Sequence, residues 1–124
     1  VIVVDFGTAT SFDIVNSSYE FEGGIIAAGM KIQAEALGNK TSKLPRLNIE
    51  SSPSFIGRNT VDAMLSGIVR GHAAMIDGLI EGCEKELGQK ATIVATGGFS
   101  SVIIPSLKRN LTLFGSKLLF DLNG

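Results

Sequence analysis

The stretch Val1-Ile2-Val3-Val4-Asp5-Phe6-Gly7-Thr8-Ala9-Thr10 decides the fold of this chain, because a β-branched apolar run ends there in a polar turn. Such a run is typical of a strand that is buried on both faces. The pattern then predicts a second strand over residues 11–15 and a third over residues 19–26, broken at Gly23-Gly24. Short polar turns join these strands, so we expect an antiparallel meander.

Helical spacing replaces the strand pattern after the third strand. We predict a helix over residues 30–37 that stops at Gly38-Asn39. The following residues, 41–53, are polar and contain two prolines, which is typical of an extended connection. One short strand is expected within it, at residues 47–49.

The second half of the chain predicts a long helix and a further strand. Asn59 or Thr60 should cap this helix, which ends near Leu87 with Gly88 after its last turn. Later elements are a buried strand at residues 91–95, a short helix from about Ser100 and an amphipathic segment at residues 114–122. The whole pattern predicts one α/β domain over residues 1–124, a mixed sheet with helices.

A helical wheel divides the long helix into faces of different character. One face is made of small residues: Ala63, Gly67, Gly71, Ala74, Gly78 and Gly82. The apolar face is expected to contain Val61, Met64, Leu65, Ile68, His72, Met75, Ile76, Leu79 and Cys83. An interior glycine costs a helix about 1 kcal/mol relative to alanine, so four on one face require a reason. We expect another helix to approach there, either from a second subunit, through Gly67, Gly71 and Gly78, or from another domain.

Composition excludes several classes of function. Formal net charge is -1 and the charges are interleaved, so no basic stripe indicates a nucleic-acid partner. The apolar runs are too short for a membrane span, and no signal-peptide pattern begins the chain. Cys83 is the single cysteine, which favours a reducing compartment; with the other absences it predicts a cytoplasmic location and no structural metal site.

Two glycine turns at strand ends are the candidate chemical sites. Asp5, after the first strand, could hold a cation, while Gly7 allows close approach of a phosphate and Thr8 and Thr10 offer hydroxyls and amides. Thr96-Gly97-Gly98 follows the later buried strand. Taken alone, the Asp5 turn fits a structural or a ligand-binding role equally well, and the Thr96-Gly97-Gly98 turn favours a structural one; two such turns on one side of a sheet predict a common ligand crevice.

The chain resembles the C-terminal half of type III pantothenate kinases. The motifs that carry the resemblance are Asp5-Phe6-Gly7-Thr8-Ala9-Thr10, Gly23-Gly24-Ile25-Ile26 with Gly29, Lys43-Leu44-Pro45, Ile56-Gly57-Arg58-Asn59-Thr60, Ser66-Gly67-Ile68-Val69, Thr96-Gly97-Gly98 and Leu111-Thr112-Leu113 with Gly115. DxGTAT followed by GGxIxxG and TGG is more selective than any one of these motifs. The resemblance covers essentially the whole chain, and the related Bvg accessory factor proteins share the same pattern.

The resemblance implies an actin-like ATPase fold and a kinase activity. It implies a ribonuclease-H-like domain, the second of two, in an enzyme that phosphorylates pantothenate with ATP and Mg²⁺ in the first step of coenzyme A biosynthesis. By position, Asp5 matches the family's monovalent-cation ligand (K⁺ or NH₄⁺), Thr60 its pantothenate contact, and Gly7, Thr8, Gly97 and Gly98 its ATP-binding residues. It also implies a homodimer.

One departure limits what the chain is expected to do alone. The family's first half supplies a DxGNT phosphate loop and a GxDR segment with the general base, and neither string occurs in these 124 residues. We therefore expect the N-terminal half to be absent and the chain to be inactive by itself, with no catalytic residue of its own. The alternatives are a non-catalytic nucleotide-binding or transcription-accessory protein of the same fold, or another phosphotransferase such as a sugar kinase.

Overall fold

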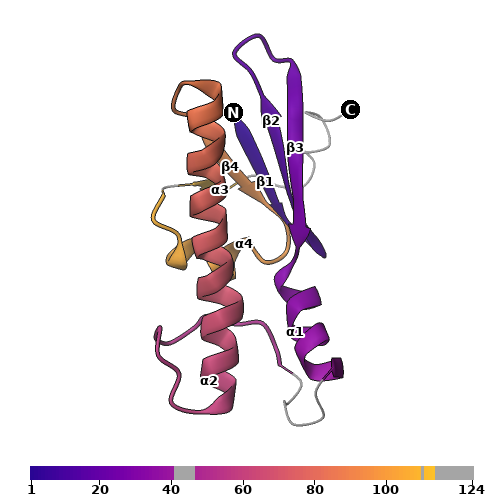
Figure 1. Cartoon of the computed structure of the whole chain (residues 1–124), viewed down its shortest axis with the longest axis vertical. Coiled ribbons are helices and arrows are strands. Elements are labelled where there is room, and N and C mark those ends of the chain that lie inside the picture. The colour runs from indigo at the N-terminus through magenta and orange to yellow at the C-terminus, as the bar shows by residue number, and fades with distance from the viewer. Residues whose placement is uncertain (41–46, 110, 114–124) are drawn as a thin grey trace.

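The computed structural model describes residues 1–40, 47–109 and 111–113. Five strands form one sheet in the order β3-β2-β1-β4-β5. Antiparallel pairs join β1 to β2 and β2 to β3, whereas β1 and β4, and β4 and β5, are parallel (Figure 1). The strands are β1 Ile2–Phe6, β2 Ala9–Val15, β3 Phe21–Ala28, β4 Ile93–Thr96 and β5 Thr112–Leu113. The predicted meander and the mixed α/β architecture are thus confirmed.

The β2–β3 hairpin is closed by an asparagine turn. The Asn16 side-chain oxygen accepts hydrogen bonds from the backbone amides of Ser18 and Glu20, each at 2.9 Å. The expected break at Gly23-Gly24 is wrong, because β3 runs through both glycines. The pairing instead shifts register next to Ile14, and Gly23 takes a φ of 139° that few other residues adopt.

The connection between β3 and the long helix differs from the prediction. Helix α1 spans Met30–Lys40, so it continues past the expected stop at Gly38-Asn39. No strand forms at residues 47–49, which are irregular. Residues 41–46, with Lys43-Leu44-Pro45, and the amphipathic segment at residues 114–122 lie outside the described residues.

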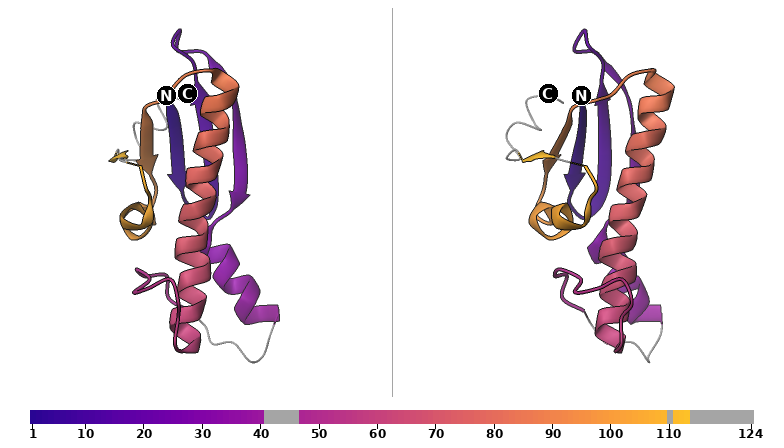
Figure 2. Two further views of the ribbon diagram at one scale, coloured as in Figure 1. Left: turned by 60° about the vertical axis from the view of Figure 1, so that its left-hand side comes forward. Right: turned by 90° about the vertical axis from the view of Figure 1, so that its left-hand side faces the viewer.

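A continuous helix runs along one face of the sheet and extends beyond the strand ends (Figure 2). It comprises α2 Thr60–Leu65, the π-helical turn η1 Ser66–Arg70 and α3 Gly71–Leu87. Of the two predicted caps, Asn59 is the one observed, since its side chain accepts from the Asp62 amide at 2.9 Å; Gly88 ends the helix as predicted, with a φ of 72°.

The π-helical turn explains where the helical wheel was wrong. The Gly71 amide bonds to the Ser66 carbonyl five residues earlier, so this turn contains one residue more than an α-helical turn would. After it, the buried positions include Ile80 and Glu84, whereas the predicted Leu79 and Cys83 are only half-buried.

The hydrophobic core lies between the helix and the sheet. It joins alternate residues of β1 and β2 to the buried side of the helix, and its members include Ile2, Val4, Phe6, Phe12, Leu65, Ile68, Ile76, Ile80 and Ile103. After β4, the chain continues through α4 Ser100–Ile103 and the 3₁₀ turn η2 Ile104–Ser106. Within the described ranges, no helix is long and apolar enough to cross a membrane.

Candidate nucleotide-binding turn

Asp5 is positioned by the alternation of β1. Val4 and Phe6 face the helix, so Asp5 lies on the opposite face of the sheet, paired with Thr96 of β4 and with Ser11 of β2. Its carboxyl group is half-buried. Burial, and then repulsion from the Asp13 carboxylate, raise the pKa of Asp5 above its ordinary value. A cation beside Asp5 would offset both effects.

The glycine turn after β4 packs directly against the end of β1. Gly97 has a φ of 102°, and a Cβ atom there would lie 2.5 Å from Asp5 Oδ1 and 2.7 Å from the Phe6 backbone. The Phe99 amide donates to the Phe6 carbonyl at 3.2 Å, and the Ser100 hydroxyl donates to the Gly97 carbonyl at 2.7 Å. The structure thus brings the two turns singled out in the sequence into contact.

A third glycine supports the turn from its other side. A Cβ atom on Gly29 would lie 2.1 Å from the Thr8 carbonyl oxygen and 2.8 Å from that of Gly7. Gly29 appeared in the sequence only as part of a motif, because a close approach between distant segments leaves no local pattern. Gly29 therefore packs closely on the carbonyls of Gly7 and Thr8, and Gly97 packs on the preceding residues Asp5 and Phe6.

Thr96 belongs to the glycine turn named from the sequence, but its hydroxyl was given no role there. Its side chain is only 2% exposed, and Oγ1 has no hydrogen-bond partner among the described residues. Because Thr96 pairs with Asp5 in the parallel register, both side chains lie on the same face of the sheet. A buried hydroxyl without a partner is costly, which marks this position as one suited to a ligand, an ion or a water molecule.

The remaining candidate residues divide into those that are accessible and those that are not. Thr8 and Gly98 are exposed, and a Cβ atom on Gly98 would meet nothing within 4 Å. Thr10, by contrast, is buried, and its hydroxyl lies 2.8 Å from His72 Nε2. The expectation that the Thr10 hydroxyl is offered to a phosphate is therefore wrong. His72 is buried, as its place on the apolar face predicted, and it is hydrogen-bonded.

Thr60 is not part of this cluster. It is exposed at the start of α2. Figure 1 shows α2 at the far end of the long helix, beyond the strand ends.

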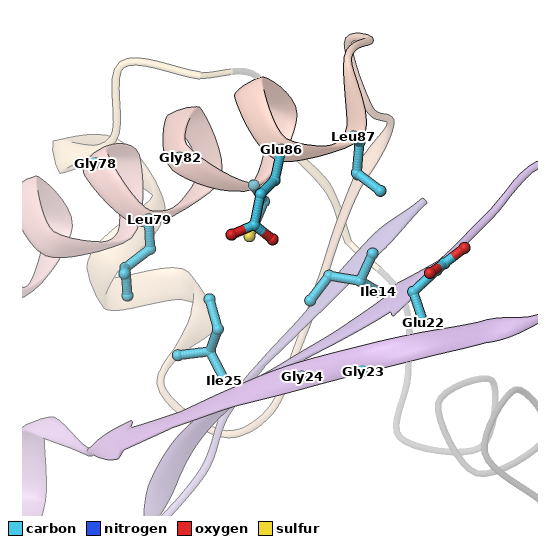
Figure 3. Close-up of a pocket in the computed structure, with 11 residues that line it drawn as sticks. Ile14, Glu22, Gly23, Gly24, Ile25, Gly78, Leu79, Gly82, Glu86 and Leu87 are labelled. Atoms are coloured by element: carbon cyan, nitrogen blue, oxygen red, sulfur yellow. The ribbon is translucent and has the colours of Figure 1, made fainter.

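A pocket of about 650 Å³ lies elsewhere, between α3 and the β2–β3 hairpin (Figure 3). Its lining includes the half-buried Cys83, the carboxylates of Glu22 and Glu86, and Gly78 and Gly82 of the small-residue face. The pocket is distant from the strand-end turn. Ile14, which lines it, is five residues along β2 from Ala9, and at 3.3 Å per residue this separates the two by about 16 Å. The strand-end turn carries the buried polar groups and the close backbone contacts, so the chemistry is assigned there.

The small-residue face of the helix is open to solvent. Gly67, Gly71 and Gly78 are exposed, and a Cβ atom on any of them would meet nothing within 4 Å. No helix of the described part of the chain occupies this face. Among the same residues, no group of three or more His, Cys, Asp or Glu side chains could hold a metal ion.

Comparison with known proteins identifies the family. The family model described as type III pantothenate kinase matches residues 1–82. The chain belongs to the type III pantothenate kinase family. Proteins named type III pantothenate kinase from Syntrophotalea carbinolica and Syntrophobacter fumaroxidans are 40% and 43% identical to it, over 97% and 98% of this chain. The alignments cover 49% and 50% of those two proteins, so the chain spans about half the length of the curated relatives it matches.

A solved structure shares the fold. It is the crystal structure of a conserved Baf family protein from Campylobacter jejuni, described as a transcriptional activator, with a TM-score of 0.66 and 21% sequence identity. The match covers 98% of this chain and 54% of that one. At this identity the likeness shows the fold and gives no support to a transcriptional role.

Proposed function

We propose that this chain forms half of an ATP-dependent kinase that phosphorylates pantothenate, the first step of coenzyme A biosynthesis. The observation that carries the proposal is the contact between the β1–β2 turn and the glycine turn after β4, around Asp5. Both turns follow the carboxyl ends of neighbouring parallel strands, where open α/β sheets bind ligands. Membership in the type III pantothenate kinase family supplies the substrate class.

Gly7, Thr8, Gly97 and Gly98 are proposed to bind ATP. Thr8 and Gly98 are exposed, and Gly98 leaves room for a ligand against bare backbone. Backbone amides can hold phosphate oxygens without basic side chains, which agrees with a net charge of -1. Thr60 is proposed to contact pantothenate; it lies at the start of α2, away from the Asp5 turn.

Asp5 is proposed to hold a monovalent cation, K⁺ or NH₄⁺, and Mg²⁺ is expected to accompany the ATP phosphates. The residues present fit a cation, because Asp5 is a half-buried carboxyl group near a second one, Asp13, and Thr96 offers an unpartnered oxygen on the same face. Bound cations neutralise charge near the phosphates. This chain would hold the ATP phosphates with the backbone amides of the two glycine turns and keep the Asp5 carboxylate next to them.

We further propose that the domain, residues 1–124, is the C-terminal ribonuclease-H-like domain of a two-domain kinase of the actin-like ATPase superfamily. The strand order β3-β2-β1-β4-β5, with a three-stranded antiparallel start and two parallel strands, supports this assignment. The length of the relatives, about twice that of this chain, agrees with a second domain. We expect the first phosphate loop and the general base to come from that domain, and the chain alone to be inactive.

We also propose that the protein forms a homodimer through Gly67, Gly71 and Gly78. These residues leave an exposed strip of backbone on the helix, and a strip without side chains permits close helix packing.

Calorimetric titration with Mg-ATP in potassium and in sodium buffer tests the nucleotide site. We expect weak binding that is stronger in potassium, and that Asp5→Asn removes this difference. Glu35→Gln, an exposed carboxylate on α1, is the matched control and should behave as the unmodified chain. Equal affinity in Asp5→Asn and the unmodified chain, or no binding by a folded chain, would contradict the proposed site.

A further inference from the structure

A hydrogen-bonded network behind the candidate turn joins four elements; His72 and Thr10 are buried and Gln33 is half-buried. His72 of α3 is 2% exposed, and its Nε2 lies 2.8 Å from the Thr10 hydroxyl on β2. Its Nδ1 lies 3.1 Å from the side-chain nitrogen of Gln33 on α1. The same Gln33 nitrogen donates to the carbonyl of Ala28, the last residue of β3, at 3.2 Å.

The hydrogen bonds of Gln33 determine which nitrogen of His72 carries a proton. The Ala28 carbonyl can only accept, so the amide nitrogen of Gln33 must face it. The second hydrogen of that nitrogen then points to His72 Nδ1, which accepts and is therefore unprotonated. The neutral imidazole carries its hydrogen on Nε2 and donates it to the Thr10 hydroxyl oxygen.

His72 also contacts the residue on the other side of the turn. Its ring meets the Phe6 ring edge-on, with centroids 6.4 Å apart. Phe6 and Thr10 are direct partners across the β1–β2 ladder, and the turn residues Gly7, Thr8 and Ala9 lie between them. One imidazole thus touches both ends of the segment that forms the candidate phosphate contact.

We propose that His72 is a positioning residue that, held as the Nε2-protonated neutral imidazole by Gln33, fixes the turn Gly7-Thr8 through Thr10 and Phe6. The inference rests on the proposed function in one respect, namely that this turn contacts the nucleotide. The contacts of His72 with Gln33, Thr10 and Phe6 do not depend on any ligand. Removing a hydrogen bond of the network should move the turn before it unfolds the sheet, because the β1–β2 ladder pairs the two strands without any contribution from His72.

Nuclear magnetic resonance of the imidazole tests the geometry directly, because His72 is the only histidine in the chain. A long-range proton–nitrogen spectrum of the ¹⁵N-labelled chain at pH 7 should show the Nε2-protonated form. Gln33→Met, which keeps the length of the side chain but removes the donor, should give a mixture of both neutral forms. An Nδ1-protonated or charged ring in the unmodified chain would overturn the proposal without any variant.

The positioning role is tested by variants at both ends of the hydrogen bond. Thr10→Val and His72→Leu should each shift the amide resonances of Gly7 and Thr8 and weaken Mg-ATP binding by about three- to tenfold, the factor for one neutral hydrogen bond. Thr10→Ser and His72→Gln, which keep a hydroxyl or a donor, should restore part of both readouts. The exposed Thr92→Val is the control and should change neither.

The outcomes separate this inference from the proposed function. Unmoved Gly7 and Thr8 resonances in Thr10→Val and His72→Leu would overturn the positioning role. No rescue by Thr10→Ser or His72→Gln would also overturn it, since a general loss of packing would then account for the effect. Shifted turn resonances in a chain that binds no Mg-ATP would support the positioning role while contradicting the nucleotide site.

Discussion

Gly97→Ala should destabilise the chain strongly, because the glycine meets two separate constraints. Its φ of 102° lies in a region where a side chain costs about 1–2 kcal/mol. The added Cβ atom would also lie 2.5 Å from Asp5 Oδ1 and 2.7 Å from Phe6 backbone atoms, and forced overpacking costs about 1–3 kcal/mol. Together these give a loss of about 2–5 kcal/mol in the free energy of unfolding, a large part of the about 5–15 kcal/mol typical of a domain.

Urea unfolding followed by circular dichroism measures this loss, and Gly98→Ala is the matched control. Gly98 is the next residue of the same turn, but its added Cβ atom would meet nothing within 4 Å. The free energy of unfolding of Gly98→Ala should therefore stay within about 0.5 kcal/mol of that of the unmodified chain. Gly98→Ala can still affect Mg-ATP binding, because it adds a group on the open side of the turn. Equal stability of the two alanine variants would refute the claim that the turn after β4 packs against the end of β1.

Three further predictions concern other parts of the same structure. Gly29→Ala should cost about 1–3 kcal/mol in urea unfolding, because its Cβ atom would meet the Thr8 carbonyl at 2.1 Å; a cost below 0.5 kcal/mol, on the order of an ordinary surface change, would contradict the close approach. Gly78→Ala should raise the free energy of unfolding by about 0.5–1 kcal/mol, since its added Cβ atom would meet nothing within 4 Å. If the proposed dimer uses this face, the same substitution should weaken self-association measured by sedimentation. A loss of stability at low protein concentration would contradict an open helix face. Burial lowers the pKa of His72, so as pH falls below about 6.5 the unfolded chain binds a proton that the folded chain does not, and stability should fall by about 1.4 kcal/mol per pH unit until the folded pKa is reached. Urea midpoints at pH 7.5 and 5.5 should therefore differ more in the unmodified chain than in His72→Gln, and an equal difference would contradict a buried neutral imidazole.

Local patterns predicted the elements whose signals are themselves local. The β-branched run predicted β1, the short polar turn after the second strand predicted the β2–β3 hairpin, and Asn59 and Gly88 predicted the two ends of the long helix. The strand expected at residues 47–49 did not form, because a short run of alternating residues forms a strand only where a partner strand is available.

Features that depend on tertiary contact were not predictable. The juxtaposition of the Asp5 and Gly97 turns was expected from the rule for strand ends, but the tight approach of Gly29 to the Gly7 and Thr8 carbonyls was not. Thr10 was assigned to the phosphate because hydroxyls in such turns commonly contact ligands. Strand alternation instead directs its side chain to the helix, where its hydroxyl lies 2.8 Å from His72 Nε2.

The extra residue in η1 sets how α2 and α3 are oriented around the axis of the long helix. Because the wide turn holds one residue more than an ordinary turn, deleting one residue between Ser66 and Arg70 would give an ordinary α-helical turn and leave α2 and α3 in nearly the same angular setting. Each residue of an α-helix turns the chain by about 100°, so deleting a second residue there would rotate α2 against α3. With His72 retained against Thr10, Thr60 would then point in a different direction. The first and second deletions in this segment should therefore have very different consequences for the two ends of the helix.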